Sequence, residues 1–342
     1  MEQIPTIDNK TVSLFRPREI ISNPANLRPE VGLFGTCGSP ASTWRQDIFI
    51  PELKKRSLAY FNPQVGPGEW TPEMAKQEAE HLANDEVLVF PISKETSGYG
   101  SLGEAGWAIL SALLRGQKLG IFVEEDDNMP EDTQRARTLF KLLATQIQQD
   151  YPVFHFENTL EDLAQWAAIT MKDRVATRNS KIKETRIIKL PTNIKTQNNI
   201  AILGTSSPTS KWKQKLKETL DNEGIAYFDP YKENWTKEDG AAEITHKTGD
   251  KVLLQIITGE TESFGSIAES GLLALSAFVR GQAYGLFIED HPSSPKSETN
   301  RARSLVKAHV KKLIDQFPGI VFLADSIEEL QKWAIKTAKM KL

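Results

Sequence analysis

The chain has 342 residues, 39% hydrophobic and 25% charged, values typical of a globular protein long enough for two domains. Its net charge of −3 argues against non-specific nucleic-acid binding as the main task. The single cysteine, Cys37, excludes an intrachain disulfide and a multi-cysteine zinc site. The sequence contains neither a signal-peptide pattern nor an apolar run of about 18 residues, which predicts a cytoplasmic protein without a membrane partner.

A long internal repeat divides the chain. The segment 100–125 (GSLGEAGWAILSALLRGQKLGIFVEE) matches 265–290 (GSIAESGLLALSAFVRGQAYGLFIED), and shorter matches lie before and after it at nearly the same offset. Such a repeat indicates duplication of a whole domain. We therefore expect an N-terminal arm, a first module, a polar linker and a second module, at residues 1–29, 30–172, 173–197 and 198–342.

Short apolar strands alternate with helices along the first module. In chain order, strands are expected at 31–36, 58–63, 86–92, 118–123 and 152–156, and helices at 43–56, 71–85, 102–116, 133–149 and 160–172. Pro51 should kink the first helix or limit it near its start. The alternation predicts two tandem flavodoxin-like or Rossmann-like α/β modules, each a parallel five-stranded sheet with helices on both faces. The linker is expected to contain one short strand within 185–190.

Ligands of such sheets bind where the strands end and the helices begin. The loop after the first strand of each module is rich in small residues, Gly35, Thr36 and Ser39 in one copy and Gly204 and Thr205 in the other. These residues would let a ligand approach backbone N–H donors, or they would simply make a tight turn. Arg45 and its counterpart Lys213 could reach a phosphate, although solvated helix charge is the simpler expectation.

A glycine-rich loop precedes Glu104, which is expected at the start of an apolar helix. A carboxylate near a helix N-terminus is held ionised and suits a nucleophile. The same spacing, Ser101-x-x-Glu104 and Ser266-x-x-Glu269, also matches a capping box, in which both side chains satisfy free N–H groups of the first turn. Both interpretations remain open from the spacing.

Three segments of the first module resemble the nucleoside 2-deoxyribosyltransferase-like family. LFGTCGSPASTWR resembles its first strand and small-residue loop, YFNP its second strand, and SGYGSLGEAGWA its signature of a glycine-rich loop leading into Glu-x-Gly-x-Ala. The resemblance covers most of each copy. The second copy keeps Glu269 and Gly271 but lacks the alanine at the signature position.

The resemblance implies that Glu104 attacks the anomeric carbon, with Glu269 as its counterpart. Asp85 and its counterpart Asp250 would help to hold sugar or base, although Asp85 also reads as a turn residue. Asn128 would correspond to an asparagine donated across a dimer interface, or to solvated loop polarity. Substrate contacts are expected from the remaining polar and glycine positions of these loops: Gly35, Thr36, Ser39, Asn62, Gly98, Gly100, Ser101, Gly204, Thr205, Asp229, Asp250, Gly265 and Ser266.

The leading hypothesis is cleavage or transfer at the N-glycosidic bond of a nucleoside, nucleotide or NAD-like molecule, with the first module as catalyst. No cofactor or metal is required, and His81 and Glu78 are interpreted as a helix-surface pair. The two modules would pack as an internal pseudo-dimer, and further self-association into a homo-oligomer stays open. The alternative is a non-catalytic nucleotide-binding sensor or scaffold on the same fold; a weaker third is a structural interaction protein in which both glutamates are only caps.

Overall fold

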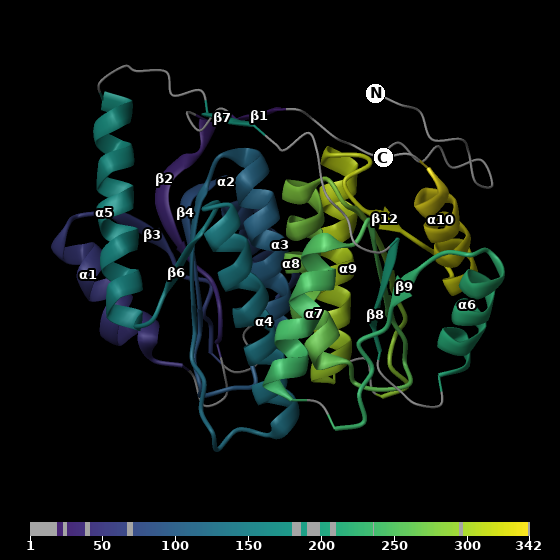
Figure 1. Cartoon of the computed structure of the whole chain (residues 1–342). Helices are drawn as coiled ribbons and strands as arrows, with labels where there is room; N and C mark the ends of the chain where they lie inside the picture. Colours follow the sequence, from purple (N-terminus) through teal and green to yellow (C-terminus); the bar gives the residue numbers. More distant parts are fainter. Residues whose placement is uncertain are drawn as a thin grey trace.

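Two parallel five-stranded sheets form the frame of the computed structural model, which describes residues 19–22, 26–37, 42–66, 71–179, 186–189, 199–205, 210–234, 236–293 and 297–340 (Figure 1). The strand order is β3-β2-β4-β5-β6 in one sheet and β9-β8-β10-β11-β12 in the other. Both follow the flavodoxin-like order 2-1-3-4-5. The prediction of two tandem α/β modules is confirmed.

The first module alternates strands and helices throughout. Its strands are β2 (Arg28–Leu33), β3 (Ala59–Phe61), β4 (Asp85–Ile92), β5 (Lys118–Val123) and β6 (His155–Glu157), and its helices are α1 (Ile50–Lys55), α2 (Pro72–Asn84), α3 (Tyr99–Arg115), α4 (Glu131–Asp150) and α5 (Leu160–Asn179). Every residue of β4 is buried, as expected for a central strand covered on both faces. Pro51 lies in the first turn of α1, directly after the π-helical segment Arg45–Phe49.

The second module repeats this plan. Its strands are β8 (Ile200–Gly204), β9 (Tyr227–Phe228), β10 (Val252–Ile257), β11 (Ala283–Ile288) and β12 (Phe322–Leu323), and its helices are α6 (Lys211–Asn222), α7 (Lys237–Gly249), α8 (Phe264–Arg280), α9 (Glu298–Gln316) and α10 (Ile327–Lys339). Strand register fixes the equivalence of the two copies. Val31 pairs with Tyr60 and Val87, while Ile200 pairs with Tyr227 and Val252. Val31 is therefore equivalent to Ile200.

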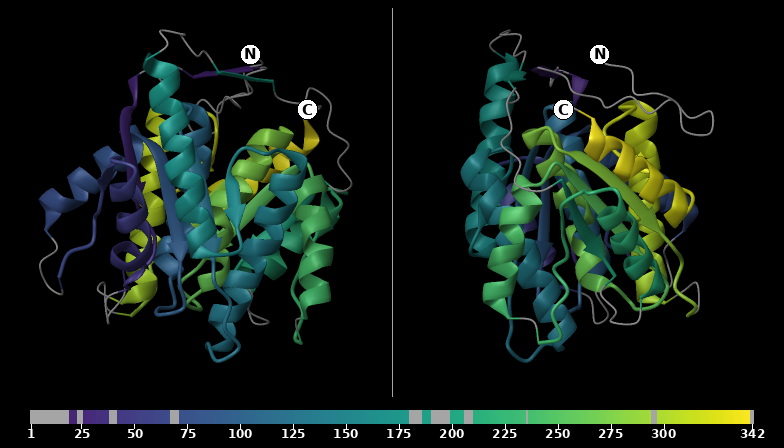
Figure 2. Two further views of the ribbon diagram at one scale, coloured as in Figure 1. Left: turned by 90° about the vertical axis from the view of Figure 1, so that its left-hand side faces the viewer. Right: turned by 45° about the vertical axis from the view of Figure 1, so that its right-hand side comes forward.

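The arm and the linker meet in a third, two-stranded sheet. Strand β1 (Glu19–Ser22) of the arm runs antiparallel to β7 (Arg186–Lys189) of the linker. Both strands lie at one end of the molecule in all views (Figures 1 and 2). The short linker strand is confirmed, whereas the pairing of the arm with it was not predicted.

The modules pack through their inner helices (Figure 1). Helix α3 contacts α8 and α9, α4 contacts α8, and one cluster of buried apolar side chains runs through both modules. Two contacts join equivalent positions of the repeat: Gly106 lies against Gly271, and the ring of Tyr99 stacks on Phe264 with centroids 3.6 Å apart. Residues that contact their own counterparts mark a two-fold axis. The chain is thus an internal pseudo-dimer.

None of the helices in the part of the chain that the structure describes is long and apolar enough to span a membrane.

Candidate functional site

A cavity of about 490 Å³ lies at the carboxyl ends of the second sheet. Leu203 and Gly204 at the end of β8 and the segment 261–266 after β10 form its walls. Strands β8 and β10 flank the point where the strand order reverses, the usual place for a ligand in such sheets. Asp132, Arg135 and Leu139 of α4 in the first module also line it. The volume is that of a small-molecule site, and both modules enclose it.

Three charged side chains form the inner end of this cavity. Lys247 Nζ of α7 lies 2.6 Å from Glu269 Oε1 and 2.8 Å from Glu243 Oε2. The lysine side chain is only 1% exposed. Burial opposes its charge, but the two carboxylates outweigh burial and raise the pKa of Lys247. Lysine therefore stays protonated and holds Glu269 in a buried ion-pair network.

The first module contains the same two carboxylates without the lysine. Leu82 takes the place of Lys247, since each lies three residues before the aspartate that ends its helix. Burial and the nearby Glu104 carboxylate raise the pKa of Glu78 to about 7, although Arg45 opposes the shift. Glu104 is 12% exposed and lies 3.4 Å from His309 Nε2 of α9. The first module thus holds an acid pair that no buried lysine neutralises.

The capping-box interpretation is wrong for both copies. Helix α3 begins at Tyr99 after Gly98, and α8 begins at Phe264 after Ser263, and neither N-terminus has a side-chain cap. Glu104 and Glu269 therefore lie in the second helical turn rather than at its start. The helices begin earlier than predicted because Gly98 and Ser263 adopt the left-handed conformation that ends the preceding loop (φ 68° and 55°). Neither carboxylate folds back to cap its own helix.

The small-residue loops after β2 and β8 are held by internal hydrogen bonds. The hydroxyls of Thr36 and Ser93 lie 2.7 Å apart, and those of Thr205 and Ser263 lie 2.8 Å apart. These contacts tie the loop after each first strand to the loop after the third strand. Gly35, at φ 103°, approaches the Pro91 carbonyl so closely that a Cβ would clash with it. These positions fix the loops, and Gly204 and Ser263 also line the cavity.

The expectation that Arg45 and Lys213 are solvated is wrong. Arg45 is fully buried and donates hydrogen bonds to the carbonyls of Leu33 and Thr36 at 2.9 and 2.8 Å. Lys213 is also buried and bonds Asp229 at 3.1 Å. Both cations therefore act within the protein, and Asp229 is engaged by Lys213 rather than presented to the cavity.

The remaining predicted substrate contacts are dispersed. Gly265 and Ser266 line the cavity. Asn62 accepts a hydrogen bond from the backbone N–H of Gln64, and the exposed Asn128 bonds Asp126 in its own loop. Gly98, Gly100 and Ser101 lie at the beginning of α3. Ser39 lies outside the described residues.

Asp85 and Asp250 lie at the opposite edge of their sheets. Asp85 is the first residue of β4, an eight-residue strand. At roughly 3.3 Å per residue, about 25 Å separate Asp85 from the loops at the carboxyl edge. It is completely buried and lies 3.0 Å from His81 Nδ1, and Asp250 contacts His246 in the same way. Burial and the neighbouring Glu30 carboxylate raise the pKa of Asp85 to about 9. These aspartates are thus not assembled with Glu104 or Glu269, because parallel strands place their first and last residues at opposite edges.

Sequence reasoning missed the residues that distinguish the two sites. Glu78 was interpreted as part of a helix-surface pair and Lys247 was not considered, yet the structure places them beside the two glutamates. The available signal was the mismatch of Leu82 with Lys247 directly after the matched histidines His81 and His246. Neither a protein-family model nor a curated protein matches the chain, so a functional assignment depends on this geometry.

Proposed function

We propose that the first module cleaves or transfers at the N-glycosidic bond of a nucleoside, nucleotide or NAD-like substrate, with Glu104 as nucleophile. The difference between the modules at one helical position carries the proposal. Where the second module places Lys247 between its carboxylates, the first has Leu82, so Glu104 is not committed to a buried lysine. A nucleophilic carboxylate and a nearby protonated carboxyl are the groups that retaining glycoside chemistry needs.

The two carboxyl groups would divide the chemistry. A carboxylate oxygen of Glu104 forms a bond to C1′ while the C1′–N bond breaks and its electron pair leaves with the base. Glu78, whose pKa of about 7 keeps much of it protonated near neutral pH, gives the departing base a proton. Water or a second base then attacks C1′ and releases Glu104, and Glu78 takes the proton of the attacking group. Water as acceptor makes the protein a hydrolase and a base makes it a transferase.

The second module fits a binding role better than a catalytic one. Its cavity of about 490 Å³ is large enough for a nucleoside, but Lys247 stabilises the charge of Glu269 and lowers its tendency to attack carbon. The cavity would then hold a ligand without turnover. One catalytic and one binding module is the arrangement that this difference supports.

The test is base release from a panel of deoxynucleosides, nucleoside monophosphates and NAD, followed by chromatography. Glu104→Gln should abolish release, while the matched Glu269→Gln should leave it nearly unchanged. Leu82→Lys, which copies the second module, should suppress release at least tenfold because the new lysine neutralises the acid pair. Ligand-induced thermal stabilisation that disappears in Glu269→Gln would support the binding role of the cavity.

Two results would contradict the proposal. Release that is lost in Glu269→Gln and kept in Glu104→Gln would assign the chemistry to the second module. Thermal stabilisation by a panel member without release of any base would leave the alternative of a nucleotide-binding sensor.

A further inference from the structure

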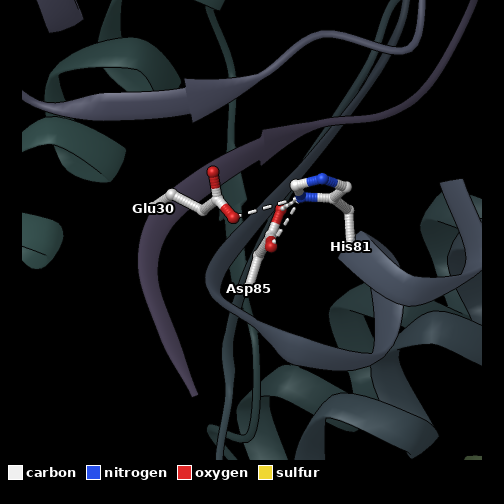
Figure 3. Close-up of side chains that lie close together, drawn as sticks. All are labelled: Glu30, His81 and Asp85. Carbon is white, nitrogen blue, oxygen red and sulfur yellow. Dashed lines mark hydrogen bonds and ion pairs between the residues drawn. The ribbon is translucent and has the colours of Figure 1, made fainter. Parts of the chain in front are cut away.

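Three side chains from three different elements converge at the amino edge of the first sheet. Glu30 comes from β2, His81 from the last turns of α2 and Asp85 from the start of β4, and Figure 3 shows them directed toward one point. Their ligand atoms all lie within 4.8 Å of one another. Glu30 and His81 are each 19% exposed, so ions can reach this point from solvent.

One imidazole nitrogen faces too many acceptors. His81 Nδ1 lies 3.0 and 3.2 Å from the two oxygens of Asp85 and 3.2 Å from Glu30 Oε1. A single N–H donates well to one oxygen, whereas three oxygens lie within reach of this one. A cation placed among them would contact all of them at once. It would replace the proton that Asp85 holds against Glu30, and the two carboxylates would then balance a charge of +2.

We propose that Glu30, His81 and Asp85 form a binding site for a divalent transition metal ion of the Zn²⁺ class, a site independent of the glycosidic chemistry proposed above. Imidazole nitrogen with carboxylate oxygen is a ligand set that suits Zn²⁺ and its neighbours better than Mg²⁺ or Ca²⁺. Ligand atoms about 3 Å apart match metal bonds of about 2.0–2.2 Å. The ring of His81 is already oriented, since it stacks on Phe61 with centroids 3.6 Å apart.

A neighbouring arginine competes with the metal. Arg28 Nη1 lies 3.3 Å from His81 Nε2 and 4.0 Å from Glu30. A metal on Nδ1 requires the proton on Nε2, which then points at a guanidinium that cannot accept it. Arg28 must therefore swing away, and its side chain, which is 42% exposed, has room to do so. Removal of this arginine should strengthen metal binding.

The second module supplies a matched control inside the same chain. His246 contacts Asp250 at 3.2 Å and stacks on Phe228 at 3.6 Å, as its counterpart does in the first module. The position of Glu30 is occupied by Asn199, because Val31 and Ile200 are equivalent. The second copy has one carboxylate fewer and should not retain the ion.

The experiment is calorimetric titration of the full chain with Zn²⁺ after treatment with a chelator, together with visible absorption on titration with Co²⁺. We expect one ion per chain. Glu30→Gln should weaken binding at least tenfold with unchanged circular dichroism, His246→Gln should leave it unchanged, and Arg28→Gln should tighten it severalfold. Asn199→Glu should raise the stoichiometry to two ions per chain.

Several outcomes would overturn the proposal. No Zn²⁺ binding by the wild-type chain, or binding that survives Glu30→Gln at full affinity, would leave the cluster as a hydrogen-bonded tie between α2 and the sheet. A stoichiometry of one in Asn199→Glu would show that the second carboxylate does not make the site.

Discussion

Replacing Lys247 by methionine should destabilise the protein in a strongly pH-dependent way. The lysine is the cation between Glu243 and Glu269, at 2.8 and 2.6 Å, and it is almost completely buried. Methionine fills a similar volume but leaves two buried carboxylates facing each other. The folded variant must therefore bind a proton on at least one of them.

The magnitude follows from the cost of holding that proton. Keeping a glutamate with an ordinary pKa of about 4.3 protonated costs about 1.4 kcal/mol for each pH unit above that value. This is about 1 kcal/mol at pH 5 and about 3.7 kcal/mol at pH 7. Burial already raises the pKa of Glu269 in the wild-type protein although Lys247 opposes the shift, and loss of the lysine raises this pKa further. The stability of the variant is therefore greatest at low pH and is lost as pH rises. The value at pH 7 agrees with the roughly 3–5 kcal/mol seen when one member of a buried pair is removed.

The assay is urea unfolding at pH 5 and pH 7, followed by tryptophan fluorescence. Leu82→Met in the first module is the matched control, because it changes the side-chain shape at the equivalent position without changing the charge. It should lower the free energy of unfolding by less than about 1.5 kcal/mol at both pH values. A loss of stability in Lys247→Met that is equal at the two pH values, or below about 1 kcal/mol at pH 7, would refute the reasoning.

Three further predictions concern the catalytic pair, the module interface and the buried arginine. The rate of base release should fall about tenfold per pH unit above pH 7 as Glu78 loses its proton. Glu78→Gln should remove this decrease at alkaline pH. An unchanged decrease in Glu78→Gln would exclude Glu78 as the acid. Gly271→Ala should lower the free energy of unfolding by about 1–3 kcal/mol, because its Cβ would lie 2.1 Å from a backbone nitrogen. Gly100→Ala has open space around its Cβ and should stabilise α3 by about 0.5–1 kcal/mol. Equal effects of the two variants in urea unfolding would contradict this. Arg137→Met should lower stability by at least about 2 kcal/mol and speed proteolysis of the 93–98 loop, since Arg137 donates to the carbonyls of Ser93 at 2.9 Å and Thr96 at 2.6 Å; unchanged proteolysis would show that the loop holds itself.

Much of the fold was predictable because its signals are local. Short apolar runs bounded by polar turns are enough to identify buried strands, and βα alternation then requires a parallel sheet. Because the repeat presents the same strand and helix patterns twice, each copy supports the assignment of the other. The start of α3 was misplaced because the sequence pattern cannot distinguish a serine that caps a helix from one already inside it, and the left-handed Gly98 decides which occurs.

The candidate site was predicted only in part. The glutamates at 104 and 269 stand out through their motif, but the side chains that control them come from α2, α7 and the opposite module. Asp85 was grouped with Glu104 although the two lie at different levels of the sheet. Grouping site residues by their proximity in the sequence fails because such proximity does not predict at which edge of a sheet a residue lies.

The amino-acid sequence by itself determined the duplicated βα architecture, since hydrophobic periodicity and the internal match are properties of the chain alone. Tertiary packing decided which charges meet: Lys247 between two carboxylates, Arg135 at a cavity of the other module, and Glu30 beside His81 and Asp85. The physical reason is that secondary structure follows local patterns, whereas electrostatic environments depend on distances between residues far apart in the chain.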